Sequence, residues 1–216
     1  MLPQQLIQGY NRFSSTRFHL EQKRYHALAE EGQSPEIMII GCCDSRVSPS
    51  IIFDTRPGEI FTARNVANLV PPYEKDKVLH HGVSASIEYG VCILKVKELV
   101  VLGHAFCGGI QSYAERSSQQ KDDHFISSWL KLLAPAEQRI EGAKYLKEKD
   151  YRKFLQSLEL TAIINSIENL KTFPFVKQRL EEGSLQLHGA YFSIAHGQLL
   201  VLNQDNLQFE LLSIQE

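Results

Sequence analysis

The sequence has no long hydrophobic run and no large cluster of one charge. Its longest apolar stretches, such as 99–102, are far shorter than the ~20 residues that a transmembrane helix needs. The formal net charge is −2 and no basic cluster exceeds a few residues, which is atypical of nucleic-acid binding. The start at Met1 lacks the basic and apolar regions of a secretory signal peptide. We therefore expect a cytoplasmic protein with neither a membrane nor a nucleic-acid partner.

Cysteine is also scarce. The 216 residues contain 4 cysteines, which are Cys42, Cys43, Cys92 and Cys107. In a reducing compartment such thiols serve as metal ligands or fill the core more often than they form disulfides, and we expect Cys92 in the core. The composition, 43% hydrophobic and 22% charged, is ordinary for a globular protein. The length fits one domain over residues 1–216.

The N-terminal residues have no strand of their own to cover. Apolar residues recur at helical spacing within 3–31, and a break at Ser14–Thr16 predicts two helices. Because no strand precedes or separates these helices, we expect residues 1–31 to form a helical arm that packs on a neighbouring subunit.

Apolar runs within 36–41 and 98–103 predict buried strands of a parallel sheet, and Pro57-Gly58 leads into a further predicted strand at 59–64. Helical patterns at 83–94 and after Gly108 alternate with these runs, and 124–182 is mostly helical. A hairpin is predicted from 184–195 and 199–203. The predicted fold is α/β, with a mostly parallel central β-sheet flanked by helices, an N-terminal helical arm and a C-terminal hairpin.

Chemically reactive side chains follow two of the predicted strands. Cys42, Asp44 and Arg46 follow the first, and His104 and Cys107 follow the third. Because the carboxyl ends of parallel strands meet at one edge of a sheet, we expect these side chains to lie together. Two thiolates and one imidazole form a ligand set that leaves a fourth position open, as in catalytic zinc sites.

Alternation along an extended segment assigns directions to neighbouring side chains. Cys42 and Asp44 face the predicted metal, whereas Cys43 faces the opposite way and is expected to be a buried apolar thiol. Asp44 either accepts a hydrogen bond from a water on the metal or is itself the fourth ligand. Arg46 lies on the same face and can hold the carboxylate through two hydrogen bonds, which would leave the fourth position to water.

The motifs Cys-x-Asp-Ser-Arg at 42–46 and Gly-His-x-x-Cys-Gly-Gly at 103–109 resemble those of the β-class carbonic anhydrases. The resemblance extends over most of the chain through Pro-Gly-Glu at 57–59, Arg-Asn-Val-Ala-Asn at 64–68 and Ile-Glu-Tyr at 87–89. It implies hydration of carbon dioxide to bicarbonate by a hydroxide on zinc, which Asp44 orients while Arg46 holds Asp44. It also implies one Zn²⁺ per subunit, and homodimers or higher homo-oligomers whose N-terminal helices embrace the neighbour.

Within that family the sequence is similar to the plant-like pattern. Gln33 matches the active-site glutamine of that pattern, and Phe61, Val66 and Tyr89 match its pocket wall. The backbone amide after Gly108 can favour an anion such as bicarbonate. The other pattern has a tryptophan where this chain has Ile39, so an open site is implied. Two departures are Cys43, where serine is usual, and a slightly longer 74–81 segment.

Two other functions fit the same residues. One is hydration of a sulfur analogue, carbonyl sulfide or carbon disulfide, since access to the pocket rather than the ligand set would separate these substrates. The other is a zinc-stabilised binding or regulatory protein that has lost catalysis. The pairing of Asp44 with Arg46 argues against the latter, because a structural zinc site needs neither.

Overall fold

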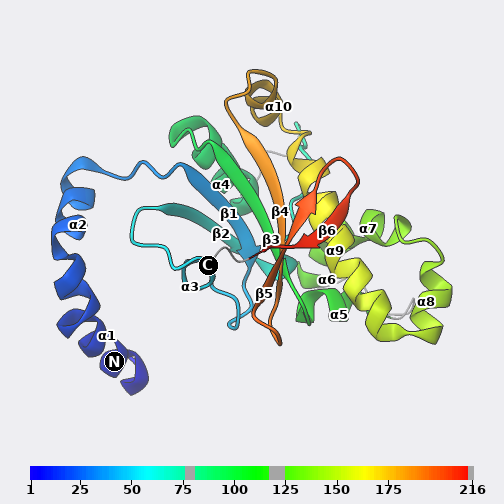
Figure 1. Cartoon of the computed structure of the whole chain (residues 1–216), viewed down its shortest axis with the longest axis horizontal. Coiled ribbons are helices and arrows are strands. Elements are labelled where there is room, and N and C mark those ends of the chain that lie inside the picture. The colour runs from blue at the N-terminus through cyan, green and yellow to red at the C-terminus, as the bar shows by residue number, and fades with distance from the viewer. Residues whose placement is uncertain (76–80, 117–124, 214–216) are drawn as a thin grey trace.

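The computed structural model describes residues 1–75, 81–116 and 125–213. Its centre is a 6-stranded sheet with the strand order β2-β1-β3-β4-β5-β6 (Figure 1). The first four strands in this order are mutually parallel, and β5 and β6 add antiparallel to the β4 side. The strands are β1 (Ile37–Cys42), β2 (Ile60–Asn65), β3 (Glu98–His104), β4 (Gln186–Ser193), β5 (Gln198–Asn203) and β6 (Gln208–Leu211).

Helices connect the strands and cover the sheet. Two α-helices precede β1, one short helix lies between β1 and β2, and the long α9 precedes α10 and β4. The α-helices are α1 (Gln4–Ser15), α2 (Arg17–Glu31), α3 (Pro49–Ile52), α4 (Gly82–Glu88), α5 (Gly108–Ala114), α6 (Phe125–Leu130), α7 (Ala134–Gln138), α8 (Ala143–Lys149), α9 (Tyr151–Leu170) and α10 (Pro174–Glu181). Single turns of 3₁₀-helix occupy Val66–Asn68 and Lys131–Leu133, and Tyr89–Ile93 forms a π-turn.

The main core lies between the sheet and the helices α4, α9 and α10. It joins Met38 and Ile40 of β1 to Ile87 of α4, Ile163 of α9 and Val176 of α10, all buried. A second core lies under α5 to α9 and contains Cys42 and Cys107. The opposite face of the sheet has a much smaller buried cluster of Ile39, Leu102 and Ala190. The metal ligands are therefore part of a packed core.

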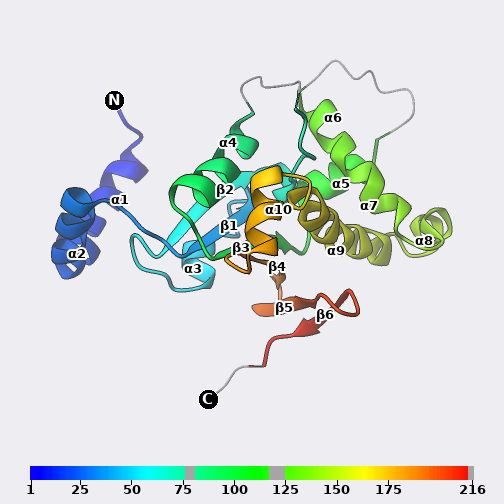
Figure 2. The same ribbon diagram turned by 90° about the horizontal axis from the view of Figure 1, so that it is seen from above.

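The arm formed by α1 and α2 lies apart from the sheet, at the left of Figures 1 and 2. Neither helix contains a buried residue. The ring of Phe13 packs against those of Phe18 and Tyr25, which holds the two helices together. Arg24 donates to the carbonyl oxygen of Pro57, and Arg56 donates twice to Glu21, so the arm contacts its own chain by polar bonds.

The fold predicted from the sequence is confirmed. The predicted strands and the helical arm are present with bounds shifted by one or two residues, within the usual spread of element ends. Strand β6 was not predicted. The predicted helix at 83–94 becomes α4 followed by the π-turn. Part of the segment 74–81 lies outside the described residues. Among the described helices, none combines the length and apolar character needed to span a membrane.

Two expectations about cysteine environments are wrong. Cys43 and Cys92 are both exposed, whereas burial was predicted for each. Cys43 does lie one residue past the end of β1, with its backbone N–H bonded to the carbonyl oxygen of Asn65. Cys92 lies in the π-turn, whose widened geometry turns it away from the core that Val91 enters.

Close packing of α9 on β3 depends on the missing side chain of Gly103. A Cβ added there would lie 2.7 Å from Cδ1 and 2.8 Å from Cγ1 of Ile163. We expect Gly103→Ala to lower the free energy of unfolding by about 1–3 kcal/mol because the core must shift. Chemical denaturation monitored by circular dichroism measures the change.

The matched control is Gly82→Ala at the start of α4, where an added Cβ meets no atom of the described residues within 4 Å. Alanine is the better helix former, so this variant should be neutral or slightly more stable. Equal stabilities for the two alanine variants would contradict the proposed packing constraint.

Candidate metal centre

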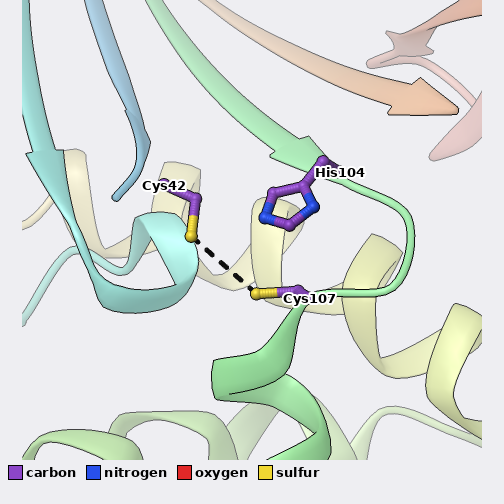
Figure 3. Close-up of side chains that lie close together, drawn as sticks. All are labelled: Cys42, His104 and Cys107. Carbon is purple, nitrogen blue, oxygen red and sulfur yellow. Dashed lines mark hydrogen bonds between the residues drawn. The ribbon is translucent and has the colours of Figure 1, made fainter. Parts of the chain in front are cut away.

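The strand ends bring the predicted ligands to one point. β1 and β3 are adjacent and parallel, with Gly41 paired to Leu102. Cys42 is the last residue of β1 and His104 the last of β3. The chain then turns through Ala105 and Phe106, so that Cys107 precedes the first turn of α5. Figure 3 shows the three side chains converging from these elements.

The positions of the ligand atoms fit a tetrahedral zinc ion. The candidate ligand atoms of Cys42, His104 and Cys107 all lie within 4.8 Å of one another, and all three residues are buried. The two sulfur atoms are 3.9 Å apart. Zinc–sulfur bonds of ~2.3 Å at the tetrahedral angle place two sulfurs about 3.8 Å apart. The two cysteines therefore need little movement to bind one ion.

The imidazole of His104 is oriented for metal binding. Its Nδ1 lies 2.9 Å from the carbonyl oxygen of Ala105. A carbonyl oxygen only accepts hydrogen bonds, so Nδ1 carries the proton and Nε2 offers its lone pair. Nε2 is buried and has no hydrogen-bond partner among the described residues. A buried nitrogen without a partner is costly, and a cation at this point satisfies it.

The thiols of Cys42 and Cys107 form a strongly interacting pair. The hydrogen bond from the Cys107 thiol lowers the pKa of Cys42 to about 4, and backbone N–H groups of Asp44 and Ala67 also favour its thiolate. The same bond, together with burial, raises the pKa of Cys107. These opposite shifts describe one proton shared between two sulfurs. A bound dication would remove that proton and hold both groups as thiolates.

Asp44 is held beside the ligands by Arg46. Nε and Nη2 of Arg46 donate to the two carboxylate oxygens at 2.9 and 2.7 Å, and the backbone N–H of Arg46 also donates to Oδ1. These bonds hold the pKa of Asp44 well below its usual range. Oδ2 lies 4.0 Å from Nε2 of His104. In the described part of the chain, the ligand cluster does not include Asp44.

Arg64 organises the same loop, although its position in the sequence indicated no role. It lies in β2 and donates to the carbonyl oxygens of Cys42, Asp44 and Val47, each at 2.8 Å. The loop after β1 is thus held by a side chain from the neighbouring strand. The sequence signal was present in the Arg-Asn-Val-Ala-Asn motif, but the three acceptors are main-chain atoms that a motif does not reveal.

Glu159 is a second residue that the sequence analysis missed. It lies in the middle of α9 with 4% of its surface exposed. One carboxylate oxygen accepts the backbone N–H of Cys107 at 3.1 Å, and the other accepts the hydroxyl of Tyr191 at 2.6 Å. Burial raises the pKa of Glu159, and burial with the nearby carboxylate raises that of Tyr191. A lone glutamate within a long helix gave no sequence signal.

The predicted substrate residues fall into two groups. Val66 packs on the core that contains Cys42 and Cys107, and Gly108 directly follows Cys107. A Cβ on the next residue, Gly109, would lie 2.7 Å from Cγ1 of Val66, so the turn of Val66 and the start of α5 are in close contact.

The second group lies at the other end of β1. Phe61 pairs with Met38, four residues before Cys42, which is a separation of about 13 Å along a strand. The rings of Tyr89 and Phe61 are 5.6 Å apart. Gln33 is exposed and precedes β1. A single chain therefore does not bring Gln33, Phe61 and Tyr89 to its own metal ligands.

Comparisons with family models, curated proteins and solved structures all find the same family. The family model described as carbonic anhydrase matches residues 37–199. Beta carbonic anhydrase 3 of Arabidopsis thaliana is 35% identical over 191 residues, which are 88% of this chain and 72% of that protein.

Solved structures of similar sequence share the fold. The β-carbonic anhydrase CcaA is 28% identical with a TM-score of 0.82, over 98% of this chain and 92% of that one. A tetrameric β-carbonic anhydrase of Sordaria macrospora is 29% identical with a TM-score of 0.79, over 92% and 95% of the two chains. The Coccomyxa β-carbonic anhydrase, solved with acetazolamide, is 25% identical with a TM-score of 0.79, over 92% and 85%.

These matches include both strands that carry the candidate ligands, and the ligand cluster itself fits one zinc ion. The chain belongs to the β-class carbonic anhydrase family, the zinc enzymes that hydrate carbon dioxide reversibly to bicarbonate and a proton.

Proposed function

We propose that Cys42, His104 and Cys107 hold the zinc ion, that Asp44 orients the attacking oxygen, and that Arg46 holds Asp44. The observation that supports this assignment best is the buried, unpartnered Nε2 of His104 beside two sulfurs 3.9 Å apart. When bound, zinc supplies a nucleophile near neutral pH by lowering the pKa of water. The remaining chemistry depends on the residues around it.

Asp44 acts as a hydrogen-bond acceptor in this proposal. Its carboxylate is ionised and cannot donate, and Arg46 occupies the side away from the ligands. Oδ2 retains accepting capacity toward the space beside Nε2 of His104. A hydrogen-bond donor held in that space would donate to Asp44. Val66 and the amide groups after Gly108 would line the position of carbon dioxide beside it.

We also propose that a second copy of the chain completes the substrate pocket with its Gln33, Phe61 and Tyr89. Two observations support a homo-oligomer. The arm exposes large apolar residues, among them Leu20 at 85% and Tyr10 at 67%, and it buries none of its own. The Sordaria macrospora relatives are tetrameric. A neighbour that covers the arm would be placed to exchange pocket residues between subunits.

A cytoplasmic location belongs to the same proposal. All four cysteines are free thiols, and two of them must remain reduced to bind zinc. A reducing compartment maintains that state.

Replacement of the ligand Cys42 should have a different effect from replacement of its neighbour Cys43. We expect Cys42→Ser to lose most bound zinc and all activity, since the hydroxyl is a poor substitute for a thiolate. Cys43→Ser should retain both, because Cys43 is exposed and faces away from the site. Zinc content by mass spectrometry and carbon dioxide hydration by stopped flow measure the two properties. Zinc retained in Cys42→Ser would refute the ligand set.

Arg46→Ala should keep zinc and lose activity. Without the two side-chain bonds Asp44 is free to move, and a misplacement of about 1 Å in a catalytic group costs on the order of 10²-fold in rate. Lys171→Ala is the matched control, because Lys171 is about as exposed as Arg46 and its ion pair, with Glu168, lies outside the site. Hydration rate per bound zinc is the measurement. An Arg46→Ala enzyme as fast as the control would contradict the role of the clamp.

Completion of the pocket by a second copy predicts complementation between two defective chains. Cys42→Ser has no metal but keeps intact pocket residues. The double variant Gln33→Ala/Tyr89→Phe keeps its metal but has defective pocket residues. Coexpressed chains should regain about one quarter of the parental activity, since half the dimers are mixed and each mixed dimer has one complete site. Separately purified variants that stay unmixed are the control. No recovery in verified mixed dimers would show that the pocket residues act within their own chain.

A further inference from the structure

The peptide group between Phe106 and Cys107 is held at both of its polar ends. Its carbonyl oxygen accepts a hydrogen bond from Nη2 of Arg46 at 2.9 Å, and its N–H donates to Oε1 of Glu159 at 3.1 Å. Phe106 has φ of 60°, which a residue with a side chain adopts only when its surroundings require it. Arg152 of α9 lies over the ring of Phe106, 3.3 Å from its centroid.

Glu159 is itself fixed from a third element. Tyr191 of β4 donates its hydroxyl to the second carboxylate oxygen at 2.6 Å, so both oxygens have partners. A carboxylate that is 4% exposed is unfavourable in a core unless it is bonded in this way. The bonds form one continuous chain from Asp44 through Arg46 and the 106–107 peptide to Glu159 and Tyr191.

We propose that Glu159 is a positioning residue for the metal centre. By fixing the N–H of Cys107, its carboxylate sets the direction of a zinc ligand. The same peptide presents the carbonyl oxygen that Arg46 uses, so Glu159 also supports the arginine that holds Asp44. The inference rests on the proposed ligand set. Among the described residues, Glu159 is the buried carboxylate that the catalytic roles leave without a use, and the proposal gives it one.

The alternative is that Glu159 only stabilises the fold, as a partner for a backbone N–H at the start of α5. Both roles predict a lower melting temperature when the carboxylate is lost. Only the positioning role predicts a change in how firmly zinc is held. The rate at which zinc passes to a chromogenic chelator, and the visible spectrum of the cobalt-substituted protein, therefore separate the two.

Glu159→Leu should release zinc about 10- to 100-fold faster than the parent protein, the usual effect of losing a residue that orients a metal ligand. Its cobalt spectrum should change in band position, because the Cys107 sulfur is no longer fixed. Glu159→Gln keeps an acceptor for the Cys107 N–H and should release zinc at close to the parental rate. Parental release by Glu159→Leu, or equally fast release by both variants, would overturn the proposal.

If Glu159→Leu does not fold, Tyr191→Phe provides the test instead. It removes one bond to Glu159 and should accelerate zinc release to a smaller extent. Tyr113→Phe is the matched control, since the Tyr113 hydroxyl donates to Glu137 at 2.7 Å without a link to a ligand. Similar melting temperatures with faster release from Tyr191→Phe alone support the inference, and equal release rates refute it. A parent protein that binds no zinc would instead refute the proposed function.

Discussion

The structure depends on the convergence of three ligand atoms at the buried ends of two parallel strands. Two sulfurs 3.9 Å apart and an imidazole nitrogen without a partner among the described residues all belong to buried side chains. Such groups destabilise a core unless a cation binds them. Folding and metal binding are therefore linked in this enzyme. Zinc would bind the two thiolates and the imidazole nitrogen that the strands and helices bring together. The packed core in turn would fix the directions of these ligands around the metal.

Hydrogen bonds between charged side chains and main-chain atoms hold the segments that carry the metal ligands. Arg64 holds three carbonyl oxygens of the loop after β1, and Arg46 and Glu159 hold one peptide of the turn after β3. The turn after β3 includes the left-handed residue Phe106, and such a residue costs of order 1–3 kcal/mol in backbone strain. The strained turn persists because charge-assisted bonds are stronger than neutral ones. Ligand placement is thus determined by contacts from β2 and α9 as well as by the ligand segments.

How far the sequence predicts this arrangement follows from the range of the interactions. The ligands Cys42, His104 and Cys107 were predictable because each is adjacent to a strand whose apolar run is visible locally. Glu159 and Arg64 were not, because their partners are backbone atoms 52 and 17 to 22 residues away. Side-chain alternation left Cys43 out of the ligand set, and the cluster found among the described residues does not include it, but alternation did not reveal that Cys43 is exposed. Strand β6 is short and mostly exposed, and it pairs along the edge that β5 offers.

The length of β1 finally explains why one chain is insufficient for the proposed site. The metal ligands lie at its carboxyl end, whereas Phe61 and Tyr89 lie beside Met38, about 13 Å away along the strand. Side-chain rotation cannot span that distance. A dimer with a twofold axis can bring these residues together, because in a self-complementary interface each subunit contributes the same residues to its neighbour. On the proposed assembly both copies then have complete sites. Metal binding would be a property of the single fold, and substrate binding a property of the oligomer.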